Sequence, residues 1–304
     1  MSKVLVTGPA GFVGSYVVRQ LINKGYTVGL LLRESSDLRR IKDLIDKCTV
    51  INGDLCDLDR IESDIAAFSP TTVMHLAWGG VKGVNRNDIS QMDNVVSSIN
   101  LFRLVEKLGC DHFVGLGSQA EYGLLSGRIS ESASKNPTTL YGAAKLATGL
   151  LLERASSASN VSFTWLRLFS SYGPGDDPSW LLPYILNCLS EGKSPRLTAG
   201  DQIWDYLYIE DVAAGIIASF EDKACGFYNL GSGEPHRLRD IVEKLRDIIN
   251  PTIDLQFGAV PYRDDQVMHL EADMTALKEA TSWYPKVSIG DGLKEISKFH
   301  KKGN

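Results

Sequence analysis

The chain has 304 residues, of which 43% are hydrophobic and 23% are charged, and this globular composition allows one large domain or two smaller ones. Its net charge of −5 argues against a nucleic-acid or membrane-surface partner. The cysteines are scattered without a Cys-x-x-Cys pair and the histidines lack metal-ligand spacing, so we expect neither disulfides nor a metal site. A strand pattern directly after Met1 leaves no room for a signal peptide, and no apolar run could span a bilayer. We therefore expect a cytoplasmic protein.

Short apolar strands alternate with helical patterns through the first half of the chain. The strand at 26–32 carries no charged residue, as expected for a parallel strand that is covered on both faces. This alternation predicts an α/β fold with a Rossmann-type doubly wound parallel sheet, which binds ligands at the carboxyl ends of its strands. The predicted strands are 4–7, 26–32, 49–51, 72–77, 113–116 and 162–167, and the predicted helices are 12–23, 36–46, 58–68, 88–108 and one that contains Tyr141.

The strand–helix rhythm breaks after residue 167, where prolines interrupt short segments. A strand–helix unit at 207–220 could rejoin the sheet. We predict that residues 1–166 form a dinucleotide-binding domain, which 204–225 rejoins. Residues 167–203 and 226–304 would form a smaller carboxyl-terminal lobe that binds substrate.

Three glycines, Gly8, Gly11 and Gly14, lie between the first strand and the first helix. Glycine permits a tight turn and close backbone approach to a pyrophosphate, which rests on the helix amino terminus. The spacing is Gly-x-x-Gly-x-x-Gly, and structural turns use glycine freely. Their position after a strand and before a helix nevertheless favours a dinucleotide site, with Phe12 and Val13 beside it.

The end of the second strand distinguishes NAD from NADP. An acidic residue there would bind the ribose 2′-hydroxyl, whereas arginine and serine favour a 2′-phosphate. Arg33 stands at this position with serines and further arginines behind it, so NADP(H) is favoured. Glu34, and the reading of these residues as a solvated basic helix start, leave NAD(H) open. After the third strand, Asp54 and Leu55 are candidate adenine contacts, and Asp54 is equally suited to capping a helix.

Ser118, Tyr141 and Lys145 together suggest an acid–base device. Tyrosine and lysine four residues apart share one face of a helix. A free tyrosine has a pKa of about 10, and a neighbouring ammonium favours the phenolate and lowers that pKa. A serine hydroxyl can hold a carbonyl or alcohol oxygen beside the same phenol. We predict that these residues make or break a carbonyl next to a hydride carrier.

In this order, the motifs resemble the extended short-chain dehydrogenase/reductase family, the epimerases, dehydratases and reductases of nucleotide sugars. The resemblance implies that Tyr141 is the acid/base, that Lys145 binds the nicotinamide ribose and that Ser118 holds the reacting oxygen. It covers nearly the whole chain and rests on the motifs jointly, because Tyr-x-x-x-Lys alone occurs on many helices by chance. The other matching motifs are Gly53-Asp54-Leu55, His75-Leu76-Ala77 beside the cofactor, Asn94, Tyr122-Gly123, Arg167 to Pro174, Asp205 to Asp211, Tyr228 to Gly233 and Trp283-Tyr284-Pro285.

Departures from the family patterns narrow the expected reaction. The dehydratases carry Asp-Glu directly after the serine position, but this chain has Gln119 and Ala120, which cannot transfer protons. Glu121, one place further, is interpreted as a polar turn residue. The epimerases usually carry asparagine where Ser170 stands and a phosphate-binding arginine where Trp204 stands. Tryptophan cannot neutralise a phosphate, although it can stack on a base or a sugar.

The segments Gly117 to Gly123 and Gln202 to Tyr206 most resemble those of the family's 4-ketoreductases. This resemblance implies NAD(P)H-dependent reduction of the C4 keto group of a nucleotide-linked 4-keto-6-deoxyhexose, a dTDP-, CDP- or GDP-sugar. The alternative is a nucleotide-sugar 4-epimerase with tightly bound NAD. A non-catalytic NAD(P)-sensing protein is less expected, because such proteins commonly lose the tyrosine or the lysine. The resemblance also implies a homodimer through the helices at 88–108 and around Tyr141, although apolar stripes there could equally face the core.

Five residues are predicted on the substrate side. The late arginine, Arg263, would bind the diphosphate, with a solvated surface arginine as the alternative. Trp78 would line the sugar pocket or belong to the core. His75 is expected to be a hydrogen-bonded core residue and not a base. The predicted substrate contacts are Trp78, Gln119, Ser170, Trp204 and Arg263.

Overall fold

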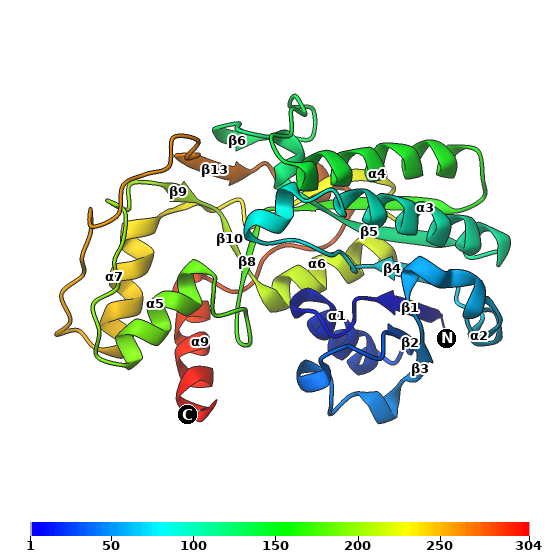
Figure 1. Cartoon of the computed structure of the whole chain (residues 1–304), viewed down its shortest axis with the longest axis horizontal. Coiled ribbons are helices and arrows are strands. Elements are labelled where there is room, and N and C mark those ends of the chain that lie inside the picture. The colour runs from blue at the N-terminus through cyan, green and yellow to red at the C-terminus, as the bar shows by residue number, and fades with distance from the viewer. Residues whose placement is uncertain (1, 304) are drawn as a thin grey trace.

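A computed structural model describes residues 2–303, and within this range seven parallel strands form one sheet (Figure 1). The strand order β11–β7–β5–β4–β1–β2–β3 confirms the predicted α/β, Rossmann-type sheet. Met1 and Asn304, the ends of the predicted domain ranges, lie outside the described residues. The strands are β1 (Lys3–Thr7), β2 (Thr27–Leu32), β3 (Thr49–Asn52), β4 (Thr72–His75), β5 (His112–Ser118), β7 (Ser162–Leu168) and β11 (Gly226–Leu230).

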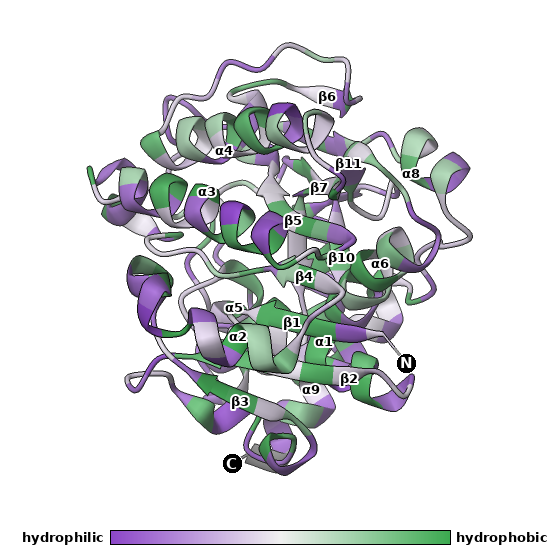
Figure 2. Cartoon of the chain, turned by 90° about the vertical axis from the view of Figure 1, so that its right-hand side faces the viewer, coloured by the Kyte–Doolittle hydropathy of each residue, from purple (hydrophilic) through white to green (hydrophobic). Residues whose placement is uncertain are grey.

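Helices cover both faces of this sheet. Val4 and Val6 of β1 belong to a core that helices α1 and α6 close, whereas Leu5 between them points into a second core beneath α2 and α3. The strands are therefore apolar on both sides, and β1 and β2 are largely green in the hydropathy view of Figure 2. These helices are α1 (Phe12–Asn23), α2 (Glu62–Phe68), α3 (Gln91–Lys107), α4 (Leu140–Ser157) and α6 (Ile209–Glu221).

The predicted helix at 36–46 is wrong, because only two single turns, η1 (Leu38–Arg40) and η2 (Ile45–Lys47), form there. Ile41 leaves helical geometry at φ −125°, directly after η1. Ile41 and Leu44 are nevertheless buried in the core against α1. The spacing of the apolar residues thus correctly indicates that one side of the segment is buried. Each of the two turns is, however, too short to continue as an α-helix.

Two other predicted helices are shorter than expected. At 58–68, the 3₁₀ segment η3 (Leu55–Arg60) takes the first residues and α2 begins only at Glu62. At 88–108, α3 begins only at Gln91, after η4 (Gly83–Asn87) and a short turn.

A smaller lobe with its own core lies beside the sheet, as predicted (Figure 1). Its helices α5, α7 and α9 pack around buried leucines and isoleucines. None of the helices in the described range has the length and apolarity needed to cross a membrane. The elements are α5 (Leu181–Ser190), α7 (Leu238–Ile249), α8 (Thr275–Ala280), α9 (Ile289–Gly303), the paired strands β8 (Ser170–Tyr172) and β10 (Tyr206–Tyr208), and a sheet of β6 (Gly127–Ile129), β9 (Ile203–Trp204), β12 (His236–Arg237) and β13 (His269–Ala272).

The strand pairing differs from the predicted domain boundaries at two points. Within 204–225, β10 pairs with β8 and not with the main sheet, and only α6 returns to the sheet by packing on α1. Within 226–304, β11 is the edge strand of the main sheet, paired with β7. The buried residues Asn229 and Leu230 explain why β11 completes the sheet. The division into two domains stays a prediction.

Buried aspartates in the motifs near 205–211 join the lobe to the sheet. The Asp205 carboxylate accepts hydrogen bonds from backbone N–H groups of Ser232, Gly233 and Ala272 at 2.7 to 3.0 Å. The Asp211 carboxylate accepts from two further backbone N–H groups beyond Pro285. These carboxylates satisfy buried donors, so the motifs have a structural role here.

Candidate active site

The glycine loop is shaped by backbone contacts that leave no room for side chains. Gly8 has φ +68°, and a Cβ there would lie 2.7 Å from the backbone of Ala77. A Cβ on Gly14 would lie 2.1 Å from the Gly8 carbonyl oxygen. The N-cap of α1, Gly11, makes no side-chain cap, and the first turn carries no acidic residue. The N–H groups of this turn therefore suit an anion such as a dinucleotide diphosphate.

The end of β4 lies directly beside this loop. Leu76 donates its N–H to the carbonyl oxygen of Thr7 at 3.2 Å, and Ala77 donates to the Thr7 hydroxyl at 3.3 Å. His75 hydrogen-bonds Thr7 and Ser98 through its two ring nitrogens, and burial lowers the pKa of His75 to about 3. His75 is thus a neutral, hydrogen-bonded core residue, as predicted.

Around the end of β2, three arginines have different surroundings. Arg39 pairs with Asp37, and Arg40 donates two hydrogen bonds to the Gly175 carbonyl oxygen. Arg33 is exposed, and its guanidinium forms no ion pair within residues 2–303. Among these three arginines, Arg33 is therefore the one whose guanidinium is free to bind a 2′-phosphate.

Asp54 caps η3 by accepting a hydrogen bond from the Cys56 N–H at 2.9 Å, with Leu55 as the first residue of that segment. The helix-capping alternative is thus observed for Asp54. The adenine contact of Asp54 and Leu55 stays a prediction.

Ser118, Tyr141 and Lys145 come together at the carboxyl end of β5. Ser118 ends the strand, and Tyr141 and Lys145 lie in the first turns of α4. Their exposed fractions are only 8%, 8% and 4%. Gly142 permits the close approach of α4, because a Cβ there would lie 2.4 Å from the Ala120 carbonyl oxygen.

Burial shifts the pKa values of both Tyr141 and Lys145. Burial raises the pKa of Tyr141, while the hydrogen-bonding Ser118 hydroxyl and the Arg86 guanidinium oppose the shift. This direction is opposite to the one that the sequence predicts from a neighbouring ammonium. The reason is the burial of the Tyr141 phenol, to which the Glu121 carboxylate adds. The Lys145 ammonium is directed elsewhere: its Nζ donates to the Leu116 carbonyl oxygen and lies 3.7 Å from the centroid of the Trp78 ring. Burial also lowers the pKa of Lys145 to about 7.

Glu121 is not simply a polar turn residue. It is fully buried, and its carboxylate accepts from the Ser118 N–H at 2.9 Å and from Trp165 Nε1 at 2.9 Å. Its other oxygen accepts from Arg167 Nε at 2.7 Å. The sequence contains a signal for this arrangement, since serine followed three residues later by glutamate is a capping box, which the structure forms.

A further cation at Tyr141 escaped the sequence reasoning. The guanidinium carbon of Arg86 lies 4.4 Å from the centroid of the Tyr141 ring. Arg86 belongs to η4, far from Tyr141 in the chain, and no motif marks it.

The predicted substrate residues divide into two groups. Trp78 lies edge-on to Tyr141, at 6.3 Å between ring centroids, and Gln119 follows Ser118 half-buried. Trp204 Nε1 donates to Ser170 Oγ at 2.8 Å, which joins two predicted contacts. Arg263 is separate, because its side chain is 76% exposed and pairs with Asp265 at 3.7 Å.

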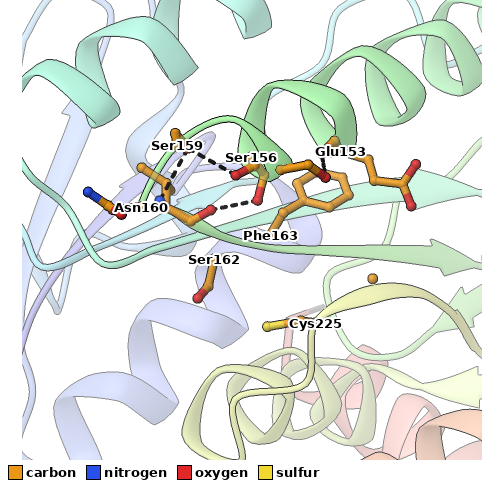
Figure 3. Close-up of a pocket in the computed structure, with 10 residues that line it drawn as sticks. Glu153, Ser156, Ser159, Asn160, Ser162, Phe163 and Cys225 are labelled. Atoms are coloured by element: carbon orange, nitrogen blue, oxygen red, sulfur yellow. Dashed lines mark hydrogen bonds between the residues drawn. The ribbon is translucent and has the colours of Figure 1, made fainter.

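Figure 3 shows a pocket of about 400 Å³ at the other end of α4 and β7. It is lined by Glu153, Ser156 and Cys225, among others. Glu153 lies twelve residues after Tyr141, roughly 18 Å along the helix. This pocket is therefore remote from the catalytic residues. Its Ser156 and Ser159 hydroxyls already donate to backbone carbonyl oxygens.

No cluster of three or more metal-ligating side chains occurs within residues 2–303.

The model of the NAD dependent epimerase/dehydratase family matches residues 4–231, three quarters of the chain. The chain belongs to this family. Other comparisons support this epimerase/dehydratase assignment. A dTDP-6-deoxy-L-talose 4-dehydrogenase (NAD(+)) from Aggregatibacter actinomycetemcomitans is 27% identical over 265 residues, 86% of this chain and 96% of that protein.

Two further family relatives match along almost their whole length. A CDP-abequose synthase from Salmonella typhimurium is 26% identical over 307 residues, 97% of each chain. The solved UDP-glucose 4-epimerase of Thermotoga maritima with UDP-glucose has a TM-score of 0.87 at 25% identity and covers 99% of each chain. Family members thus share this fold while their names give different reactions.

Proposed function

We propose that this epimerase/dehydratase family member reduces the C4 ketone of a nucleotide-linked 4-keto-6-deoxyhexose with NAD(P)H. The observation that carries the proposal is the buried group of Ser118, Tyr141 and Lys145. Gln119 and Ala120 directly follow Ser118 in the sequence. This group can polarise and protonate a carbonyl oxygen. The two residues that follow Ser118 cannot remove water from a sugar.

In this proposal the bound dinucleotide supplies a hydride to the carbonyl carbon. Ser118 hydrogen-bonds the carbonyl oxygen, and Tyr141 donates the proton that completes the alcohol. Lys145 is four residues after Tyr141 on the same face of α4, where it would hold the nicotinamide ribose. The buried Trp165 and Arg167 hold Glu121, which in turn holds the Ser118 backbone.

We infer a preference for NADP(H) from the unpaired charge of Arg33. A 2′-phosphate would give this guanidinium a bidentate partner. Arg39 already holds Asp37, so a second exposed cation contributes less. The ratio of kcat/KM for NADPH and NADH in the parent and in Arg33→Ala tests the preference. A ratio that stays the same would contradict it.

On the substrate side, stacking on the Trp204 ring would replace the phosphate contact that an arginine makes in the family's epimerases. The Trp204 ring is fixed by Ser170, so it offers a flat apolar surface where the family's epimerases carry a cation. Arg263 would then supply the charge for the diphosphate. Trp78, edge-on to Tyr141, would lie beside the sugar.

The alternative function, 4-epimerisation with tightly bound NAD, is supported by the likeness to the UDP-glucose 4-epimerase structure. It uses the same three residues but returns the hydride to the same sugar after the sugar rotates. Such an enzyme consumes no reduced cofactor.

The experiment that tests the proposal is a panel of dTDP-, CDP- and GDP-4-keto-6-deoxyhexoses with NADPH or NADH. We expect loss of reduced nicotinamide with at least one sugar, and the product's C4 configuration is then assigned. Interconversion of UDP-glucose and UDP-galactose without consumption of added cofactor would establish the alternative. No reaction with any of the sugars would contradict both.

We also propose a homodimer through α3 and α4. Met92 and Val96 on α3, and Leu150 and Leu151 on α4, are between 47% and 56% exposed. Apolar residues gathered on two adjacent helices are typical of a protein interface. Sedimentation should give twice the chain mass, and Val96→Asp should give the single chain mass. A parent protein that sediments as a monomer would contradict this proposal.

A further inference from the structure

The segment at residues 79–90, here called the strap, connects β4 to α3 and is fixed at both ends. Gln91 is 1% exposed, and its side-chain amide donates to three carbonyl oxygens of the strap at 2.9 to 3.2 Å. Asn87 of the strap accepts a hydrogen bond from the N–H of Leu140, the first residue of α4. The strap is therefore fixed to the helix that carries Tyr141.

The strap also reaches the smaller lobe. Lys82 forms an ion pair with Asp177 and lies 5.7 Å from the centroid of the Trp180 ring. Asp177 and Trp180 immediately precede α5. One segment thus contacts both the catalytic helix and the lobe in which Ser170, Trp204 and Arg263 lie.

Arg86 is the strap residue that reaches the catalytic centre. Its guanidinium lies over the Tyr141 ring, within the range of a cation–π contact. A guanidinium stays charged throughout the physiological pH range. A positive charge this close favours the phenolate over the phenol.

The other groups that face Tyr141 do not supply a fixed positive charge. Ser118 on β5 offers a neutral hydroxyl, and Trp78 offers the edge of a ring. Glu121 in η5 carries a carboxylate, which disfavours the phenolate. Lys145 on α4 directs its Nζ to the Leu116 carbonyl oxygen, and with a pKa of about 7 it is only partly charged near neutrality. Arg86 is the permanent cation among these groups.

We propose that Arg86 is a positioning residue that stabilises the phenolate of Tyr141, and that the strap holds it there. The proposal rests on the proposed role of Tyr141 as the proton donor, but not on the identity of the nucleotide or the sugar. When the carbonyl carbon accepts the hydride, its oxygen takes the proton of Tyr141. The O–H bond of Tyr141 breaks and its electron pair stays on the phenolate beneath Arg86 until water returns a proton.

The direct test measures the ionisation of Tyr141 without turnover. Phenolate absorbance is recorded from pH 7 to 11 in the full-length protein with NADP⁺, and the spectrum of Tyr141→Phe is subtracted. The same subtraction is made in the background of Arg86→Gln, Arg86→Lys and Arg103→Gln. Arg103 is an exposed arginine of α3 and serves as the control for net charge.

Loss of a neighbouring cation disfavours the phenolate, so Arg86→Gln should raise the midpoint by about one pH unit. Arg86→Lys and Arg103→Gln should keep the parent midpoint. An unchanged midpoint in Arg86→Gln would overturn the proposal, as would equal shifts in Arg86→Gln and Arg103→Gln. A parent that forms no Tyr141 phenolate up to pH 11 would overturn it too.

A second measurement uses the rate of reduction with whichever nucleotide sugar is a substrate. Tyr141 must be protonated to act as the acid, so the rate falls above its pKa. In Arg86→Gln this alkaline limb should move upward, with a lower kcat and an unchanged KM for the cofactor. If no sugar is reduced, the proposed function fails while the absorbance test still decides the role of Arg86.

Discussion

The catalytic residues and the predicted substrate residues differ in how the protein holds them. Ser118, Tyr141 and Lys145 are buried at the end of β5, and backbone contacts fix the elements that carry them. Arg263 lies on an exposed segment of the smaller lobe, and its side chain pairs with the nearby Asp265. The difference teaches that the catalytic residues are held rigidly at the end of the sheet, whereas Arg263, the proposed diphosphate ligand, lies on an exposed segment that little else holds. Motifs therefore indicate the reaction type more sharply than the substrate.

Tyr141→Phe should give the largest effect, because it removes the proton donor from the fixed part of the site. We expect turnover to fall by roughly 10² to 10⁴-fold. The Kd for NADPH should stay close to that of the parent, since the glycine loop is unchanged. Steady-state kinetics and fluorescence titration measure the two quantities. Turnover within tenfold of the parent would remove Tyr141 from its role.

Glu121→Gln tests whether the stability of the protein depends on the buried ion pair between Glu121 and Arg167. The substitution leaves the buried Arg167 charge without a partner, which should lower the free energy of unfolding by about 3–5 kcal/mol. The matched control is Glu191→Gln, which breaks the exposed pair with Lys193 and should leave the free energy of unfolding close to that of the parent, because water screens exposed pairs. Urea unfolding gives both values. Equal losses in the two variants would show that burial does not distinguish the pairs.

Gly14→Ala tests the backbone fit of the glycine loop. The added Cβ meets the Gly8 carbonyl oxygen, and relief of such a clash costs about 1–3 kcal/mol, which corresponds to roughly 5 to 150-fold in Kd for NADPH. Gly290→Ala is the control, because its nearest neighbour would lie 3.9 Å away. If both variants bind NADPH as the parent does, the close approach is not needed for the cofactor.

Arg263→Ala should give the smallest effect, because the side chain is largely exposed. We expect KM for the nucleotide sugar to rise by at most about fivefold, with kcat unchanged. Lys278→Ala, an exposed lysine on α8, is the control and should change neither. A hundredfold rise in KM in Arg263→Ala would mean that the exposed segment closes tightly on the substrate. The contrast between the rigidly held catalytic residues and the exposed Arg263 would then disappear.

The sequence predicts those features of the fold that periodic patterns and backbone geometry determine. The sheet, α1 and the glycine turn follow from local residues, and the structure confirms them. The capping box of Ser118 and Glu121 is also readable, but the distant partner Arg167 decides that Glu121 is buried. Arg86 reaches Tyr141 only through the path of the strap.

The errors arise where tertiary packing overrides a local pattern. The apolar residues Ile41 and Leu44 lie in turns, because the core takes them without a continuous helix. The edge strand β11 pairs with β7 although the chain leaves the sheet for most of the preceding segment. Such long-range pairing leaves no mark in the spacing of residues.

The most direct test of the account follows deuterium from the cofactor. The full-length protein is incubated with NADPH deuterated at nicotinamide C4 and with a nucleotide-linked 4-keto-6-deoxyhexose that the panel identifies. A reductase places one deuterium on C4 of the sugar for each reduced cofactor consumed, and this is the result that we predict. A product with unlabelled C4, formed while the added NADPH persists, would contradict the proposed reduction.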